Sequence, residues 1–460
     1  MGGISYYSTN RNINEAGFTP FKDLVSFKDA LMMGQAPDAG LFMPERMPNF
    51  SRGEIEDLRG KRYFEIAHTV LEKFLYADID SDYLLSICKE AYNFKVPIEK
   101  VHDRKYLLRL DQGPTASFKD FAARMMARLM GALKDENKQL NILVATSGDT
   151  GSAVGEAFKG VNGINVFILY PEGEVSGRQK KQLDTIGGNI TTLAVNGKFD
   201  DCQDLVKIAF QDKDLECLNL TSANSINIGR ILPQIIYYFY AYLEKSEEGE
   251  KILISVPAGN FGNSLGCEFG RRMGLPIHKL IMAVNENDEF PKYLDQGVYQ
   301  KLSPSKACIS SAMNVGHPSN LARFFDLYGG TIDKSGKVLK YPDIKKMKTN
   351  IFSVSISNQK TRETIKNVYD KYGVILEPHG AVGWAGLEAY YHDNGDFPLC
   401  VSLETAHPAK FPEEINSLLG FEPELPASMK DVDRRQGCPI KIENDYIQLK
   451  KFLKSTIENK

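Results

Sequence analysis

At 460 residues the chain is too long for one ordinary domain, and its length favours two to four. A composition of 42% hydrophobic and 25% charged residues is typical of a globular protein, and a formal charge of −3 gives no indication of nucleic-acid or anionic-membrane binding. No apolar run approaches the roughly 18 residues that span a bilayer, and the N-terminus lacks a signal-peptide pattern. We therefore expect neither a nucleic acid nor a membrane as a partner.

The seven cysteines stand singly, with no C-x-x-C pair, and their odd number argues for reduced thiols and a cytoplasmic location. The seven histidines are equally dispersed and form no pair at metal-binding spacing. We therefore expect no metal site.

Residues 1–100 predict a mainly helical N-terminal domain that ends near Pro97. Apolar residues recur at helical spacing in two stretches, 64–74 and 84–91. We expect Ser81 to cap the second helix.

The next segment carries a lysine in an unusual place. Gly113-Pro114 marks a turn, Ser117 is the expected helix cap, and Lys119 then falls in the first helical turn. The apolar face of this helix is formed by Phe118, Phe121, Met125, Leu129 and Leu133. The positive end of a helix disfavours a cation, so it lowers the pKa of an amine and favours attack on a carbonyl. The alternative is a solvated surface lysine, which holds for most of the 56 Lys and Arg residues taken singly.

Beyond residue 100, short apolar runs alternate with helical stretches. The runs that predict strands are 141–145, 164–169, 251–256, 279–284, 351–356 and 399–403. This alternation indicates an α/β core, residues 101–460, with a parallel sheet covered by helices on both faces. We expect a smaller subdomain at about 140–245 and a larger one formed by the remainder. A final helical face with Leu449 and Leu453 is expected to dock on the core.

Two glycine-containing polar loops follow predicted strands, Ser147-Gly-Asp-Thr-Gly151 and Gly259-Asn-Phe-Gly-Asn263. Backbone N–H groups at such a strand–loop–helix junction bind anions. Neither loop is a Rossmann or P-loop motif, so a small phosphate-bearing cofactor is favoured over a nucleotide. The alternative for the first loop is an ordinary turn with a helix cap.

Other segments allow two interpretations. Thr405 and His407 follow a predicted strand and form either a site loop or a helix cap, while residues 377–382 favour a turn over a site loop. Asn224–Asn227 supplies caps or ligands, and the aromatic stripe behind it is expected in the core. Gly262-Asn-Ser-Leu-Gly266 matches the G-x-S-x-G nucleophile motif, but Ser264 lies too far beyond its strand to favour a hydrolase.

A lysine at a helix start and two anion-binding loops together imply a cofactor that is both an aldehyde and a phosphate, which describes pyridoxal 5′-phosphate (PLP). The chain resembles the threonine synthase family of fold-type-II PLP enzymes along its whole length. The motifs that carry the resemblance are Tyr7-Ser-Thr-Asn-Arg11, Gly40-Leu-Phe-Met-Pro44, Gly113-Pro-Thr-Ala-Ser-Phe-Lys-Asp-Phe121, Thr146-Ser-Gly-Asp-Thr-Gly151, Asn224-Ser-Ile-Asn227, Gly259-Asn-Phe-Gly-Asn263, Met313-Asn-Val-Gly-His-Pro-Ser-Asn320, Glu377-Pro-His379 and Thr405-Ala-His-Pro-Ala-Lys410.

The resemblance implies a tryptophan synthase β-like fold behind a helical N-terminal domain. It implies that Lys119 is catalytic, forming the Schiff base and then acting as acid–base, and that Thr405 hydrogen-bonds the pyridine nitrogen. The implied cofactor-binding residues are Lys119, Gly259, Asn260, Phe261, Gly262, Asn263 and Thr405. The implied substrate-binding residues are Ser147, Gly148, Asp149, Thr150 and Asn224.

The implied reaction converts O-phospho-L-homoserine and water to L-threonine and phosphate by γ-elimination and β-addition, in a monomer or homodimer. The cation that holds the substrate phosphate stays open among Arg124, Arg230 and Lys410. The alternatives are another fold-type-II PLP lyase acting on a hydroxy or sulfur amino acid, and a non-catalytic PLP-binding protein.

Overall fold

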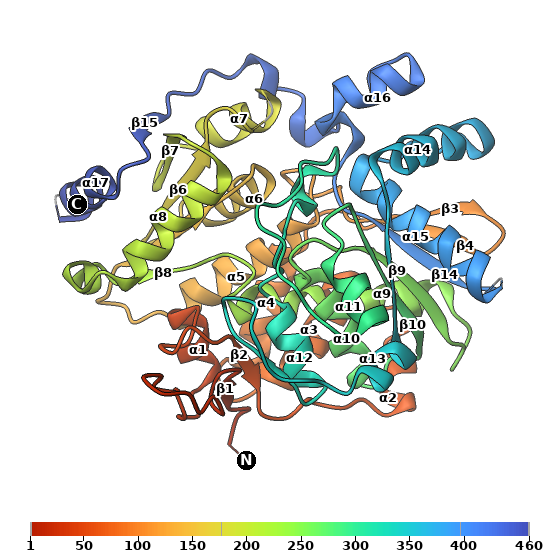
Figure 1. Cartoon of the computed structure of the whole chain (residues 1–460), viewed down its shortest axis with the longest axis horizontal. Coiled ribbons are helices and arrows are strands. Elements are labelled where there is room, and N and C mark those ends of the chain that lie inside the picture. Colours follow the sequence, from red (N-terminus) through yellow and green to blue (C-terminus); the bar gives the residue numbers. More distant parts are fainter. Residues whose placement is uncertain (1, 176, 396, 459–460) are drawn as a thin grey trace.

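The fold is organised around two sheets, seen in a computed structural model that describes residues 2–175, 177–395 and 397–458 (Figure 1). The six-stranded sheet has the order β13-β10-β9-β14-β4-β3. Its strands are β3 (Ile98–His102), β4 (Lys105–Arg109), β9 (Ile252–Pro257), β10 (Ile277–Val284), β13 (Ile351–Ser355) and β14 (Cys400–Glu404). The five-stranded sheet has the order β15-β7-β6-β5-β8. Its strands are β5 (Leu140–Ala145), β6 (Ile164–Pro171), β7 (Ile190–Asn196), β8 (Leu220–Thr221) and β15 (Ile440–Glu443).

All six predicted strands are confirmed as β5, β6, β9, β10, β13 and β14. The predicted parallel sheet is confirmed for β13, β10, β9, β14 and β4, while β3 pairs with β4 at one edge as an antiparallel hairpin. The turn between them places Asp103 in the left-handed region at φ 44°. These edge residues are mostly half-exposed, so they do not form the continuous apolar run of a buried parallel strand.

Helices cover both faces of the six-stranded sheet. On one side α15 (Pro378–Asn394) packs on β9, β10 and β14, with α14 (Asn358–Tyr372) packed beside it. On the other side α10 (Gly262–Arg272) packs on β9 and β10 and contacts α9 (Ile236–Lys245). The remaining helices of this part are α11 (Glu289–Gln296), α12 (Leu321–Leu327), α13 (Ile344–Asn350) and α16 (Pro412–Leu419), and a small hairpin is formed by β11 (Thr331–Ile332) and β12 (Val338–Lys340). No helix in the described ranges is long and apolar enough to cross a membrane.

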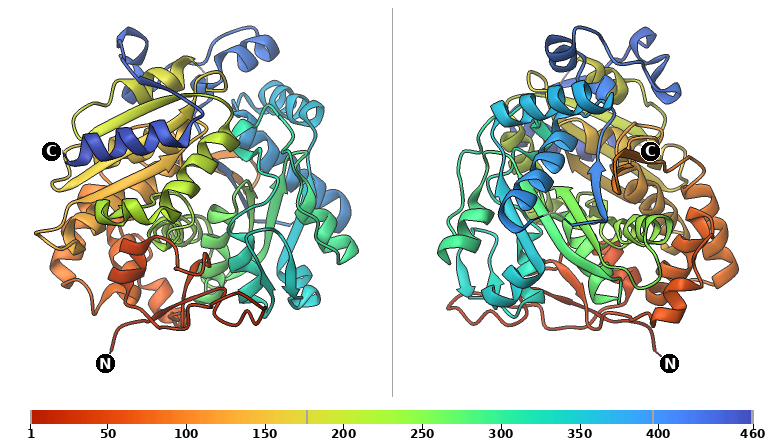
Figure 2. Two further views of the ribbon diagram at one scale, coloured as in Figure 1. Left: turned by 60° about the vertical axis from the view of Figure 1, so that its left-hand side comes forward. Right: turned by 90° about the vertical axis from the view of Figure 1, so that its right-hand side faces the viewer.

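The five-stranded sheet is parallel throughout and includes the end of the chain. Its helices are α5 (Lys119–Leu133), α6 (Asp149–Phe158), α7 (Gly177–Asp184), α8 (Phe199–Gln211) and α17 (Tyr446–Glu458). The predicted docking helix is confirmed, because α17 buries Leu449 and Leu453 against this sheet (Figure 2). The subdomain limits stay predictions, although β15 pairs with β7 rather than with the larger sheet.

The N-terminal segment contains the short antiparallel strands β1 (Tyr6–Ser8) and β2 (Phe42–Pro44) and four helices. These helices are α1 (Phe27–Met33), α2 (Arg52–Glu56), α3 (Tyr63–Leu75) and α4 (Ser81–Ala91). The predicted cap of α4 is wrong by one residue, because the side chain of Asp80 accepts the N–H of Tyr83 at 3.1 Å. A carboxylate and a hydroxyl are both good caps, so adjacent Asp and Ser cannot be separated by pattern alone.

Candidate active site

Lys119 is the first residue of α5, as predicted, and backbone pairing carries it to the end of β14. The N–H of Phe118 donates to Thr405 O at 2.9 Å, and the N–H of His407 donates to Ala116 O at 3.1 Å. Ser117 is not the helix cap, since Phe118 holds that position and the Ser117 hydroxyl accepts only a long 3.4 Å bond from Lys119 N. The bridge to Ala406 extends the backbone at Ser117, which shifts the helix start by one residue.

The loop before Lys119 is fixed beneath the helix by Asp120. The carboxylate of Asp120 accepts the N–H of Thr115 at 2.9 Å and the hydroxyl of Thr115 at 2.7 Å. Gly113 lies so close that a Cβ there would meet the Asp120 carboxylate at 2.4 Å. This packing holds the first turn of α5, and with it Lys119, in place.

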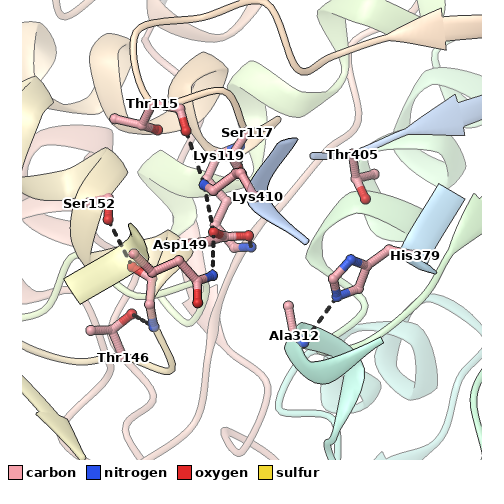
Figure 3. Close-up of polar contacts among 12 residues, drawn as sticks. Thr115, Ser117, Lys119, Thr146, Asp149, Ser152, Ala312, His379, Thr405 and Lys410 are labelled. Carbon is pink, nitrogen blue, oxygen red and sulfur yellow. Dashed lines mark hydrogen bonds and ion pairs between the residues drawn. The ribbon is translucent and has the colours of Figure 1, made fainter. Parts of the chain in front are cut away.

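Two lysines share one buried carboxylate (Figure 3). Lys410 Nζ lies 2.6 Å from Asp149 Oδ1, and Lys119 Nζ lies 3.7 Å from Asp149 Oδ2. Lys410 also donates to Thr115 O at 3.0 Å and is fully buried. The close pair is therefore Lys410–Asp149, and Lys119 is the looser partner.

This arrangement favours a neutral amine at Lys119. Burial lowers the pKa of Lys119, Asp149 opposes that change, and the positive charges of Lys410 and Arg230 lower the pKa further. Burial alone would raise the pKa of Asp149, but Lys410 and Lys119 hold it well below its usual range. Asp149 is thus ionised, and Lys410 already neutralises most of its charge.

The loop before α6 is shaped to present Asp149. Gly148 has φ 128°, and a Cβ there would meet the side chain of Gln179 at 2.9 Å. The hydroxyl of Thr146 accepts the N–H groups of Gly148 and Gly151, both at 2.9 Å, while Gln179 Nε2 donates to Asp149 Oδ1 at 2.9 Å. The backbone turn and Gln179 together orient the carboxylate toward both lysines.

The glycine loop lies between β9 and α10, with Phe261 in the left-handed region at φ 61° just before the helix. Asn263, in the first turn, is oriented by the hydroxyls of Tyr237 and Tyr238, each 2.5 Å from its Oδ1. Its Nδ2 is buried and has no hydrogen-bond partner among the residues that the structure describes. The prediction that the aromatic stripe is core is confirmed for Tyr237 and Tyr238, but their contact with Asn263 was not foreseen.

An unpartnered buried donor at the start of an 11-residue helix fits an anion, because the N–H groups of the first turn also lack helical partners. PLP carries both groups, a phosphate that would be held there and an aldehyde that would bind Lys119. The residues present therefore fit this cofactor.

A second chain of hydrogen bonds runs beside Thr405. Its hydroxyl donates to Glu377 Oε1 at 3.2 Å, and Glu377 Oε2 accepts His379 Nδ1 at 2.5 Å. His379 Nε2 in turn accepts the N–H of Ala312 at 3.0 Å, which fixes the tautomer of the neutral ring (Figure 3). Glu377 and His379 are thus buried at the site, contrary to the expected turn. Only their place in the Glu-Pro-His motif could have indicated this.

The structure does not support two of the site roles considered from the sequence, a nucleophile at Ser264 and a phosphate-binding cation at Arg124. Ser264 is buried inside α10, and within the described ranges its hydroxyl has no hydrogen-bond partner, so the nucleophile-motif alternative is wrong. Arg124 donates to the carbonyls of Ala91 and Glu90, at 2.7 and 2.8 Å, and is directed at the end of α4. Asn224, by contrast, has a buried Oδ1 that accepts no hydrogen bond from the described part of the chain.

The fold and site define a class, the PLP-dependent enzymes of fold type II. The family model described as pyridoxal-phosphate dependent enzyme matches residues 96–398. Models described as threonine synthase N terminus and threonine synthase, C-terminal match residues 5–92 and 380–453. The chain belongs to the threonine synthase family.

Curated relatives and solved structures agree with this assignment. The chain is 38% identical to threonine synthase of Haemophilus influenzae, with 94% of this chain and 97% of that protein covered. A PLP-bound threonine synthase structure from Brucella melitensis matches with a TM-score of 0.89 and 32% identity over 98% of this chain and 99% of that one. The threonine synthase from yeast matches with a TM-score of 0.88 and 30% identity over 100% of this chain and 99% of that one.

Proposed function

We propose that this protein is a threonine synthase, a lyase that converts O-phospho-L-homoserine and water to L-threonine and phosphate. The observation that carries the proposal is the largely buried Lys119 at the start of α5, whose pKa is lowered by burial, in a chain that belongs to this family. Bound PLP supplies the aldehyde that Lys119 takes and the ring that accepts electrons from the substrate.

Lys119 moves the protons of the reaction. A neutral amine takes a proton from the substrate Cα, and the same flexible side chain reaches Cβ and Cγ as phosphate leaves and water adds. Burial and the positive charge of Lys410 favour the neutral form of the amine between steps, while the predicted loop Ser147, Gly148 and Thr150 binds the substrate carboxylate. Asn224 offers its unpartnered Oδ1 as a further polar contact to the substrate.

A direct assay tests this proposal against its rivals. The protein with PLP is given O-phospho-L-homoserine, serine, threonine or O-acetylserine, and the products are measured. Phosphate and threonine formed in equal amounts from the first compound alone are expected. Turnover only of another amino acid would instead indicate a different lyase, and bound PLP without any turnover would indicate a non-catalytic protein.

Arg230 is the best placed of the three cations for the substrate phosphate. It is buried near Lys119, and no described residue hydrogen-bonds its Nε. Burial lowers the pKa of Arg230 to about 10, which leaves it charged at neutral pH. Lys410 is committed to Asp149, and Arg124 is directed at α4.

Replacing Arg230 with methionine is expected to raise KM for O-phospho-L-homoserine on the order of 100-fold, because a charged partner of the phosphate is lost. Steady-state kinetics measure this change, and PLP affinity should stay near the wild-type value. Arg124→Met is the matched control and should leave KM unchanged. A rise in KM for Arg124→Met alone would reverse the assignment.

Thr405 is placed to contact the pyridine nitrogen, and its hydroxyl proton is directed at Glu377. Thr405→Val is expected to lower kcat/KM roughly tenfold and to shift the visible absorption of the bound cofactor, because one hydrogen bond to the ring is lost. The control is Thr361→Val, a buried threonine on α14 that donates to Ser357 O at 2.8 Å. If the absorption maximum does not move, Thr405 does not contact the ring.

We also propose that the enzyme works in the cytoplasm as a monomer or homodimer. The dispersed single cysteines support a reducing compartment. Light scattering of the purified protein would distinguish the two assembly states.

We also propose that residues 140–245, approximately, form the predicted smaller subdomain and that this subdomain carries Asp149.

A further inference from the structure

Arg323, on α12, is a fully buried side chain whose hydrogen bonds reach only uncharged groups. Its Nε donates to Phe42 O at 3.1 Å, and its Nη2 donates to Ile226 O at 2.7 Å. Its Nη1 donates to Asn320 Oδ1 at 2.6 Å and to Ser225 O at 3.2 Å. Arg323 therefore joins three separate segments of the chain at one point.

The positive charge of Arg323 has no carboxylate partner in the described part of the chain. Burial lowers its pKa to about 9, and no neighbouring charge contributes to that change. Arg109 shows the usual arrangement, since it is also largely buried and pairs with Asp111 at 2.6 Å and with Glu99 at 3.1 Å. A buried charge without a counter-charge is costly, so a compensating anion is expected close by.

The glycine loop is suited to an anion, and hydrogen bonds link it to Arg323. Asn320, which accepts from Arg323, donates its Nδ2 to Asn260 O at 2.9 Å. Asn260 is a residue of that loop, and its side chain donates to Ser225 Oγ at 2.6 Å and accepts from Ser319 N at 2.5 Å. Two hydrogen bonds thus connect the guanidinium to the loop backbone.

We propose that Arg323 is the buried counter-charge of the cofactor phosphate and that it positions the phosphate loop through Asn320. The inference rests on the proposed phosphate site at Gly259–Asn263. The phosphate dianion supplies the negative charge that no described carboxylate provides near Arg323. Asn320 links α12 to the loop through its hydrogen bond to Asn260 O. Arg323 is a positioning residue, since Asn320 stands between it and the loop.

The alternative is a purely structural role, in which Arg323 only ties Phe42, Ser225 and Ile226 together. The two roles differ in which ligand they affect. A structural role lowers stability and weakens all ligands alike. A counter-charge matters for PLP and inorganic phosphate, but not for pyridoxal, which has the aldehyde without the phosphate.

The test measures the affinity of the cofactor-free protein for PLP and for pyridoxal by absorption and by thermal shift. Arg323→Met removes the charge, Arg323→Gln removes the charge but keeps an amide donor, and Arg323→Lys keeps the charge. In the two neutral variants we expect PLP to lose affinity on the order of 10- to 100-fold relative to pyridoxal. The lysine variant should keep a PLP-to-pyridoxal affinity ratio close to the wild-type ratio.

Arg124→Met is the matched control, because Arg124 also donates to backbone carbonyls but lies away from the loop. An unchanged ratio in the neutral variants would overturn the proposal, whatever happens to their melting temperature. If the methionine variant does not fold, the glutamine variant decides. Phosphate release from O-phospho-L-homoserine by the wild-type protein is measured separately, so a negative result for the Arg323 variants does not contradict the proposed reaction.

Discussion

Replacing Lys119 with alanine is expected to lower kcat on the order of 1,000-fold or more, since the same amine binds the cofactor aldehyde and moves the substrate protons. The visible absorption band of the cofactor held through Lys119 should disappear as well. Absorption spectra and a continuous phosphate-release assay measure the two effects on one sample. Added methylamine should restore part of the turnover, because it supplies the missing amine.

Lys134→Ala is the control for this experiment, since Lys134 lies at the other end of the same helix. It should keep both the absorption band and the turnover. The assignment of Lys119 fails if the alanine variant folds, binds PLP and still releases phosphate at the wild-type rate.

Replacing Lys410 with methionine is expected to shift the acid limb of the pH–kcat/KM profile to higher pH. Lys410 lowers the pKa of Lys119, and it also neutralises Asp149, whose charge raises that pKa. Loss of Lys410 removes a positive charge that lowers the pKa of Lys119 and leaves the negative charge of Asp149 free to raise it. The pKa of Lys119 therefore rises, and less neutral amine is present at pH 7. Activity on the acid limb should fall roughly tenfold for each pH unit of the shift.

Asp149→Asn provides the opposite arm of the same experiment. Loss of the carboxylate removes the group that raises the pKa of Lys119, so the acid limb should move to lower pH. Lys441→Met is the control, because Lys441 pairs with Glu172 at 2.6 Å on the surface, away from Lys119. Shifts of the same sign in the Lys410 and Asp149 variants would contradict the shared-carboxylate arrangement.

Much of the core could be predicted because its signals are local. Apolar runs marked six strands, and helical spacing after a Gly-Pro turn placed Lys119 in the first turn of α5. The same reasoning missed β7 and β8 of the five-stranded sheet, the hairpin of β3 and β4, and the short strand β15. The residues of β3, β4 and β15 are mostly exposed or half-exposed and do not form a distinct pattern. It also placed the caps at Ser81 and Ser117 one residue too late and one too early, respectively.

Some features of the candidate site could likewise be predicted from the sequence, and others could not. Its two loops were visible because polar, glycine-containing segments follow apolar strands, and the family motifs named Lys119, Asn263 and Thr405. The relations among these residues were not visible, since spacing along the chain carries no distance between separate elements. The Glu377–His379 hydrogen bonds, for example, reach Thr405 only because β14 and the start of α15 are neighbours in the fold.

By itself the sequence determined the α/β class, the lysine, the anion-binding loops and the resemblance to one family, because each is written in residues adjacent along the chain. Only the tertiary structure decided which charges meet. In the tertiary structure Lys410 pairs with Asp149 and Arg124 hydrogen-bonds the end of α4. Arg230 and Arg323 are buried with no carboxylate partner among the described residues. The energy of a charge depends on burial and on neighbours a few ångströms away, and folding alone brings those neighbours together.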